Sequence, residues 1–154
     1  MKQLLLITGI LSVLCFSCDE ADVLAEFNTT DFWETHHSQS WDSTSTANEL
    51  LGTWVWEYNV CCPLGVTFEG SNKSSENVKV IFSVSEIKMI IEDEVTTTTN
   101  WGVTEIDDNL FALNMDNPIP ILHGRILFAD NRVLFNASYI DSADNYFYKD
   151  LSDN

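Results

Sequence analysis

The feature that most constrains the fold is a series of short segments, beginning at Gly52, in which apolar and polar residues alternate. In the first segment Trp54, Trp56 and Tyr58 fall on one face and Glu57 on the other. Alternation with a period of two is typical of a strand that buries one face. Asp, Asn and Pro residues separate the later segments at positions suited to turns. The pattern predicts about eight strands, at residues 52–60, 77–83, 86–93, 94–104, 109–115, 119–128, 132–139 and 145–149.

Successive short strands joined mostly by tight turns predict an all-β domain. We expect an antiparallel up-and-down meander closed into a barrel, because closure removes the exposed sheet edges. The interior of a barrel of about eight strands is filled by side chains or holds one small ligand. A barrel that spans a membrane needs an apolar outer face, whereas here Glu57, Lys79 and Lys88 lie opposite the apolar residues. The predicted barrel therefore does not cross a membrane.

A short helical turn is predicted just before the first strand. Thr46 and Glu49 have the spacing of a capping box, in which each side chain satisfies a backbone amide at the helix start. Leu50 and Leu51 follow, and Gly52 is a suitable stop. We expect this turn to plug one end of the barrel.

The N-terminal segment has the features of a secretory signal. Lys2 precedes an almost wholly apolar stretch over residues 4–16, which is shorter than the roughly 20 residues that span a bilayer. Ser17-Cys18 at its end resembles the signal box of bacterial lipoproteins. That resemblance implies a signal peptide over residues 1–17 and acylation of Cys18, which anchors the chain in a membrane. The alternative is cleavage by an ordinary signal peptidase near Ser17, which leaves Cys18 as a free thiol.

Residues 18–45 are predicted to form an acidic, largely extended linker. They contain no Lys or Arg, are rich in Ser and Thr, and lack sustained strand or helix periodicity. Acids directly after Cys18 resemble those of bacteroidete-type lipoproteins, which implies an outer-membrane lipoprotein facing the periplasm or the cell surface. Phe32, Trp33 and Trp41 in this linker either pack back on the domain or contact a partner. Adjacent His36 and His37 point in opposite directions in an extended chain, so we expect no metal there.

The start of the first strand resembles a known family. The run Leu50-Leu51-Gly52-Thr53-Trp54-Val55-Trp56 is similar to the opening of lipocalin-like domains in bacterial lipoproteins. The resemblance implies a lipocalin-like barrel over residues 46–154, with Trp54 packed at its closed end. It also implies a basic residue from the last strand against this tryptophan, and Lys149 is the candidate. The chain departs from the family at Cys61-Cys62, where these domains often carry paired glycines.

Eight aromatic residues are candidates for the barrel interior. They either line a cavity for a small apolar ligand or fill a narrow barrel completely. These residues are Trp54, Trp56, Tyr58, Phe82, Trp101, Phe111, Phe135 and Tyr139.

Cys61 and Cys62 are the thiols that remain after signal cleavage and acylation. Secretion places them where disulfides are permitted, so a redox role is open. Three states stay open: two reduced thiols, a strained disulfide between neighbours, and a bond to another molecule.

Composition and motifs narrow the functional classes. A formal net charge of −17 argues against nucleic acid and anionic headgroups as partners. The sequence contains no nucleophile elbow, zinc-protease motif or phosphate-binding glycine loop, so we expect no enzyme, metal or cofactor. Two functions lead: a lipid-anchored envelope protein that binds a small apolar ligand, and a non-catalytic module that recognises protein or glycan through its loops. An enzyme ranks third and last, because no pair of carboxylates stands out as catalytic. The oligomeric state is open.

Overall fold

The computed structural model describes residues 29–61, 66–68 and 77–152. Helices α1 (Thr29–His37) and α2 (Ser43–Leu50) precede the strands, and two short 3-10 helices, η1 (Pro120–Leu122) and η2 (Ser138–Ile140), interrupt them. The strands are β1 (Gly52–Cys61), β2 (Val66–Phe68), β3 (Val78–Phe82), β4 (Glu86–Ile91), β5 (Glu94–Asp107), β6 (Leu110–Met115), β7 (Arg125–Ala129), β8 (Arg132–Asn136) and β9 (Ala143–Lys149).

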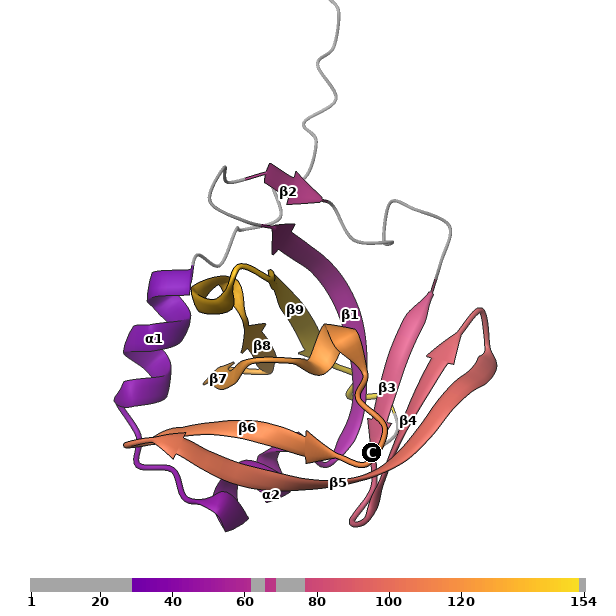
Figure 1. Ribbon diagram of the computed structural model, residues 1–154, viewed down its shortest axis with the longest axis horizontal. Helices are drawn as coiled ribbons and strands as arrows, with labels where there is room; N and C mark the ends of the chain where they lie inside the picture. The colour runs from indigo at the N-terminus through magenta and orange to yellow at the C-terminus, as the bar shows by residue number, and fades with distance from the viewer. Residues whose placement is uncertain (1–28, 62–65, 69–76, 153–154) are drawn as a thin grey trace, which may run out of the picture.

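The strands form a closed antiparallel barrel (Figure 1). Strands β1 and β3 to β9 follow one another around the sheet, and β9 pairs back with β1, for example Trp56 opposite Phe147. The short β2 pairs with the far end of β1. The predicted meander of eight strands closed into a barrel is therefore confirmed, and β2 is an addition that alternation did not reveal.

Strands β6 and β7 share the least backbone pairing of the neighbouring strands in the barrel wall, and we call the junction between them the seam. A single register pair, Phe111 with Ile126, joins these strands, whereas β7 and β8 are in register along their whole length. The prediction of one strand over residues 119–128 is wrong in its first half, because η1 occupies that part. Pro118 and Pro120 lack the amide hydrogens that a strand ladder needs.

Helix α2 has eight residues and is longer than the predicted helical turn. Its capping residues also differ from the predicted pair. Asp42 is the N-cap: its side chain accepts a hydrogen bond from Ser45 N at 2.7 Å, and Ser45 Oγ accepts one from Asp42 N at 2.8 Å. The helix therefore begins three residues before Thr46, where the sequence placed its start. It ends at Leu50, whose side chain is completely buried in the barrel interior.

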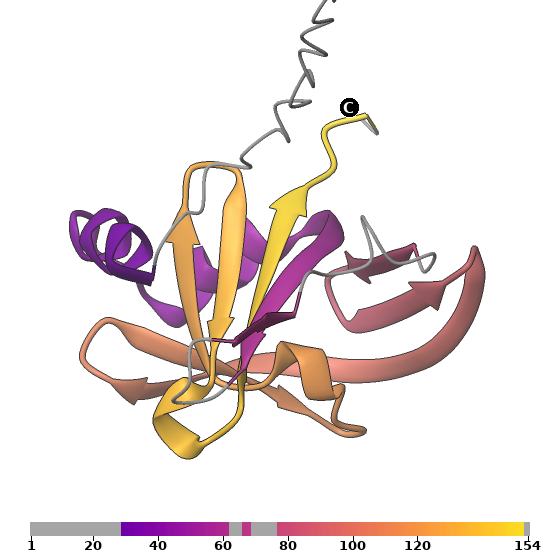
Figure 2. The same ribbon diagram turned by 90° about the horizontal axis from the view of Figure 1, so that it is seen from above.

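The prediction of an extended linker is wrong from Thr29 onward. Helix α1 lies against the outer side of the barrel wall, beside β7 (Figures 1 and 2). Phe32 and His36, one helical turn apart, share the face that the barrel buries, and both are fully inaccessible to solvent. Only two residues of a nine-residue helix carry this signal, which is too few for periodicity to reveal. Residues 18–28 lie outside the described part of the chain.

Two hydrophobic clusters lie on the two sides of the wall. We call the first the interior cluster; it packs inside the barrel and contains Leu50, Trp54, Val80, Phe82, Ile87, Phe111, Ile119, Leu122, Ile126, Phe128, Val133, Phe135 and Phe147. We call the second the outer cluster; it packs beneath α1 and contains Phe32, Leu110, Leu127, Ala129, Leu134 and Tyr146. Alternation along β7 and β8 explains both clusters, since neighbouring residues point to opposite faces.

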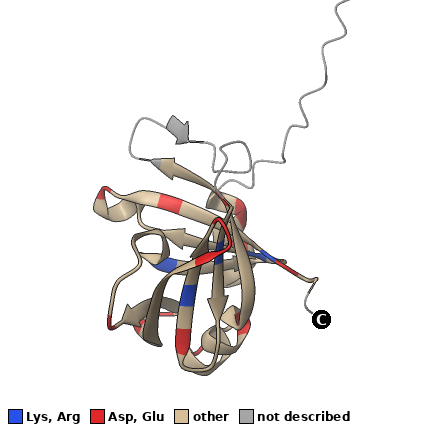
Figure 3. Ribbon diagram, turned by 90° about the vertical axis from the view of Figure 1, so that its right-hand side faces the viewer, with Lys and Arg blue, Asp and Glu red and all other residues tan. Residues whose placement is uncertain are grey.

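Charged residues lie on the strands and turns outside these clusters. Figure 3 shows Asp and Glu in the turns and at strand ends, with few Lys and Arg among them. The turn between β4 and β5 illustrates this: Glu92 and Asp93 both adopt positive φ values of 52° and 64°. No helix in the described ranges is long and apolar enough to cross a membrane.

Candidate functional site

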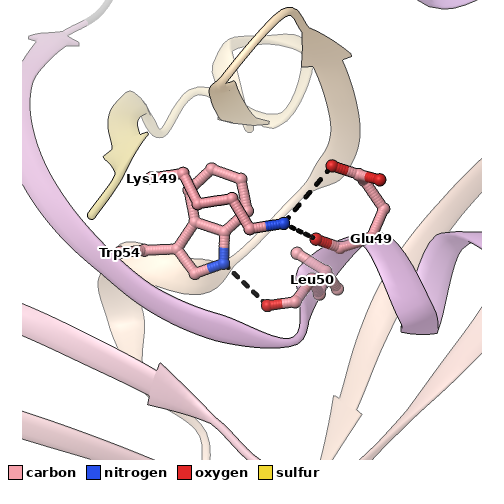
Figure 4. A network of polar contacts seen from close by, with 4 residues as sticks. All are labelled: Glu49, Leu50, Trp54 and Lys149. Carbon is pink, nitrogen blue, oxygen red and sulfur yellow. Dashed lines mark hydrogen bonds and ion pairs between the residues drawn. The ribbon is translucent and has the colours of Figure 1, made fainter. Parts of the chain in front are cut away.

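The closed end of the barrel is built around Trp54. Its side chain is fully buried, and Nε1 donates a hydrogen bond to Leu50 O at 2.7 Å (Figure 4). The Lys149 ammonium lies 5.1 Å from the centre of the Trp54 ring. It donates to Glu49 O at 2.9 Å and lies 3.4 Å from Glu49 Oε1. These contacts join α2, the first strand and the last strand at one end of the barrel, with Lys149 in the place that the lipocalin resemblance implies.

Gly52 provides the sharp turn from α2 into β1. Its φ of +117° lies in the region that side chains rarely adopt. Space is not the constraint, because a Cβ there would meet Lys149 Cε at an ordinary 3.7 Å. Backbone conformation therefore accounts for glycine at this position, and the turn brings Leu50 O under the indole of Trp54.

Six of the eight predicted aromatic residues lie in or against the interior cluster. Phe82 and Trp101 make an edge-to-face contact at 5.2 Å between ring centres, and Phe135 does the same with Phe147 at 5.6 Å. Such contacts stabilise the barrel beyond the burial of apolar area alone. The six are Trp54, Trp56, Phe82, Trp101, Phe111 and Phe135.

The other two predicted residues, Tyr58 and Tyr139, do not face the interior. The register of β1 against β9 shifts between Trp56 and Tyr58, which indicates a bulge at Glu57. One extra residue reverses the faces that follow, so Tyr58 stacks on Tyr146 at 4.4 Å beside the outer cluster. Tyr139 lies in η2, is 48% exposed and packs against the Arg125 guanidinium at 3.9 Å from the ring centre.

Two buried polar side chains accompany the interior residues, and sequence analysis missed both. Asn145 is 4% exposed and accepts a hydrogen bond from Trp56 Nε1 at 3.2 Å. Thr99 is 5% exposed and accepts one from Asn117 N at 2.8 Å. The alternation of Asn145 with Phe147 along β9 is the signal that would have placed Asn145 on the inner face.

Apart from Trp41, which lies between α1 and α2, seven apolar side chains pack on the interior cluster yet stay partly exposed to solvent. We call this set the interior rim: Trp56, Met89, Trp101, Val103, Leu113, Met115 and Ile121. Two register pairs across β5 and β6 belong to it, Trp101 with Met115 and Val103 with Leu113. Aromatic and methionine side chains suit a binding surface, because they offer a large and adaptable apolar area. The rim is where the interior cluster meets solvent.

The histidines and cysteines singled out in the sequence do not form a metal site in the described residues. His36 is buried with both ring nitrogens in hydrogen bonds, to Asn109 O and from Phe128 N, so neither nitrogen is available to a metal. Within the described ranges, no group of three or more His, Cys, Asp and Glu side chains could hold a metal ion. Backbone pairing places Cys61 opposite Ala143 at the end of β1. Cys18, Cys62 and the side chain of Cys61 lie outside the described part.

A second feature lies on the outer surface around Arg125. Its guanidinium lies between two aromatic rings, 5.7 Å from the centre of Trp33 and 3.9 Å from that of Tyr139. The buried Nε of Arg125 has no hydrogen-bond partner. Tyr139 and Ile140 beside it are 48% and 46% exposed. We call Trp33, Arg125, Tyr139 and Ile140 the outer patch.

Comparisons with known proteins do not assign the chain to a family. No family model matches it, and neither the curated proteins nor the solved structures that were compared gave a match.

Proposed function

We propose that this protein is a lipid-anchored component of the bacterial cell envelope whose lipocalin-like barrel binds a small apolar ligand. The observation that carries the proposal is the interior rim: apolar side chains that pack on the barrel core and remain partly open to solvent. A closed end around Trp54 supports it, because a cup needs one end shut. The signal over residues 1–17 and acylation at Cys18 supply the anchor, in the outer membrane.

The rim favours an apolar ligand over a charged one. Every member of the rim is hydrophobic. The two buried polar side chains described with the interior, Asn145 and Thr99, already have hydrogen-bond partners. A ligand that removes about 200 Å² of apolar surface from water gains roughly 5 kcal/mol before the costs of association. Specific polar recognition contributes little in this arrangement, so we expect selection by size and shape.

A titration with a hydrophobic fluorescent probe, 1-N-phenylnaphthylamine, tests the proposal. We expect saturable binding to the full chain and at least a tenfold loss of affinity in Leu113→Glu, which puts a charge on the rim. Ile106→Glu is the matched control, since Ile106 lies on the same strand pair and is 45% exposed but is not part of the interior cluster. Absence of saturable binding, or an equal loss in both variants with unchanged melting temperatures, would contradict the proposal.

The anchor has a separate test. Cys18→Ser should abolish incorporation of a radiolabelled fatty acid and move the protein from the detergent phase to the aqueous phase. The physical reason is that a protein surface this acidic contributes little attraction to anionic lipids, whereas two acyl chains hold stably. Equal labelling and partitioning of the two forms would show that Cys18 is not the attachment site.

The outer patch favours a second candidate function, a non-catalytic module that recognises a protein or a glycan. Tyr, Trp and Arg are the residue types most enriched at binding hot spots, and three of the four patch residues belong to them. Tyr139→Ser should then abolish partner binding and leave probe binding at the rim unchanged. The opposite outcome, with Leu113→Glu as the damaging variant, favours the ligand-binding barrel.

A further inference from the structure

The seam between β6 and β7 is bridged by a side chain from outside the sheet. Counting outward from the pair of Phe111 and Ile126 toward the turn before β6 places Asn109 opposite Phe128. In a regular antiparallel ladder every second pair of opposed residues exchanges backbone hydrogen bonds directly. Here His36 of α1 lies between them: its Nδ1 accepts from Phe128 N at 3.2 Å, and its Nε2 bonds to Asn109 O at 3.0 Å. The imidazole takes the place of a rung in the barrel wall.

This arrangement requires one protonation state of His36. Phe128 N carries a hydrogen, so Nδ1 must be unprotonated to accept it. Asn109 O is an acceptor, so Nε2 must carry the hydrogen. The neutral tautomer with hydrogen on Nε2 fits both partners, and the imidazolium does not, because a hydrogen on Nδ1 would face the Phe128 amide hydrogen.

The bridge is covered by the segment that joins α1 to α2. The ring of Trp41 stacks on the His36 ring, with 5.4 Å between centres and 6° between planes, and lies 4.7 Å from the Phe128 ring. Trp41 N donates to Asn109 Oδ1 at 2.6 Å, and Trp41 Nε1 donates to His36 O at 3.1 Å. His36 is left with no exposed surface, so a proton can reach Nδ1 only when the cover moves.

We propose that the seam between β6 and β7 is a pH-operated joint in the barrel wall, which neutral His36 holds shut and protonated His36 releases. Protonation puts a buried charge in an apolar site. It also sets the new N–H at Nδ1 of His36 against the N–H of Phe128. Both penalties are relieved when α1 and Trp41 move away. Release opens the wall beside Phe111 and Phe128, two members of the interior cluster. The joint is a property of the barrel wall and requires no bound ligand.

The surroundings of His36 hold no buried charge that would stabilise the imidazolium. The ionisable groups on the elements packed against it are Asp31, Glu34 and His37 on α1, Asp107 and Asp108 before β6, Arg125 on β7 and Asp130 after β7. Arg125 is half-buried and the others are exposed. The nearest is His37, whose ring centre is 5.5 Å away and whose charge opposes protonation. Burial is the main cause that lowers the pKa of His36 below its ordinary 6.5, although the bond to Asn109 O acts in the opposite sense.

Hydrogen exchange read by mass spectrometry tests the joint in the full chain, purified in detergent. After correction for intrinsic rates, exchange in peptides that cover β7 should rise by up to about tenfold per pH unit between pH 7 and pH 5, because one proton is taken up on opening. His36→Gln should remove this rise, since the amide of Gln offers one acceptor and one donor and does not titrate. Peptides covering β9, which pairs on both sides, serve as the internal reference.

His37→Gln is the matched control, because His37 is exposed and its Nδ1 bonds within α1 to Trp33 O. It should keep the rise in β7. The proposal is overturned if wild type and His36→Gln give the same pH response, or if β7 and β9 rise together in the wild type, which indicates global unfolding.

An NMR titration of the wild-type protein keeps the proposal falsifiable if His36→Gln does not fold. The chain has three histidines, and ¹⁵N-labelled imidazole reports the tautomer and charge of each. His36 should be the neutral form with hydrogen on Nε2 at pH 7 and should gain a proton in step with exchange in β7. A His36 that stays neutral while β7 exchange rises, or that titrates near 6.5 with no change in exchange, excludes the joint.

Discussion

At the scale of single residues, the closed end of the barrel depends on a few polar contacts in an apolar setting. Trp54 uses its one donor on Leu50 O, and Lys149 satisfies Glu49 O while its charge faces the indole ring. A buried indole N–H without a hydrogen-bond partner would destabilise the folded protein. The turn at Gly52 brings Leu50 O to the indole of Trp54, so the turn and this tryptophan form one structural unit. Through Lys149 and Glu49, this unit joins the last strand of the domain to the helix that precedes the first strand.

Lys149→Met should therefore lower the free energy of unfolding by about 1 to 2 kcal/mol. The variant keeps the aliphatic stem that packs near Gly52 and removes the ammonium that binds Glu49 O. Chemical denaturation measures the change, and Lys88→Met on the exposed side of β4 is the control, expected within about 0.5 kcal/mol of wild type. Equal stability of all three proteins would contradict this role for Lys149.

His36 should make stability fall on mild acidification. Its lowered pKa means that the unfolded chain binds a proton below pH 6.5 that the folded chain does not. Stability is unaffected by this group above that pH and falls as pH drops toward the folded pKa, by at most about 1.4 kcal/mol per unit. Urea unfolding at pH 7.5 and 5.5 should show a smaller difference for His36→Gln than for wild type. Asp42 and Asp150, with pKa values lowered from 3.8, stay ionised in this window.

At the scale of elements, the start of β7 is set by a close approach of two backbones. Gly124 has φ +107°, and a Cβ on it would lie 2.2 Å from Asn136 O. The backbone of Asn136 cannot retreat easily, because β8 pairs with both β7 and β9. The glycine ends the irregular stretch after η1 and allows Arg125 to begin the strand.

Gly124→Ala should cost more than about 2 kcal/mol, through strain at positive φ and the clash with the chain of Asn136. Gly102→Ala in β5 is the matched control, since a Cβ there meets nothing within 4 Å. That change should be neutral or slightly stabilising. Thermal melts of the two variants decide the matter, and a similar melting temperature for both would show that the approach at Gly124 is not rigid.

The loop after β8 is held by one carboxylate. Asp144 is 4% exposed and accepts hydrogen bonds from Ala137 N at 2.7 Å and Ser138 N at 2.8 Å, and from the Asn136 side chain. Asp144→Asn should cost about 1.5 to 3 kcal/mol, because an amide cannot accept all of these bonds. Asp141→Asn, at an exposed position with φ 58° that Asn also adopts, should leave the melting temperature unchanged.

At the scale of the whole molecule, alternation was sufficient to predict the barrel and insufficient for its exceptions. The inner faces of β3 and β8 follow from period two, as Val80 and Phe135 illustrate. The bulge at Glu57 has no signature in sequence, and it moves Tyr58 to the outer face. Helix α1 escaped notice because its burial depends on partners distant in sequence, such as Tyr146 against Phe32.

The candidate site was predicted in the same uneven way. Residues within regular strands, such as Trp56 and Trp101, lie where alternation placed them. Tyr139 lies inside η2, three residues after β8 ends at Asn136, so alternation no longer applied. The sequence could not predict that the His36 side chain replaces a backbone hydrogen bond between β6 and β7. That replacement requires α1, Asn109 and Phe128 to meet in space.

Native mass spectrometry of the full-length protein, extracted in detergent, tests the proposed binding of a small apolar molecule by the barrel. We expect a population heavier than the protein alone by one small molecule, which organic solvent removes and a series of fatty acids or similar apolar compounds replaces. The mass of the protein alone, unchanged after incubation with those compounds, would contradict binding.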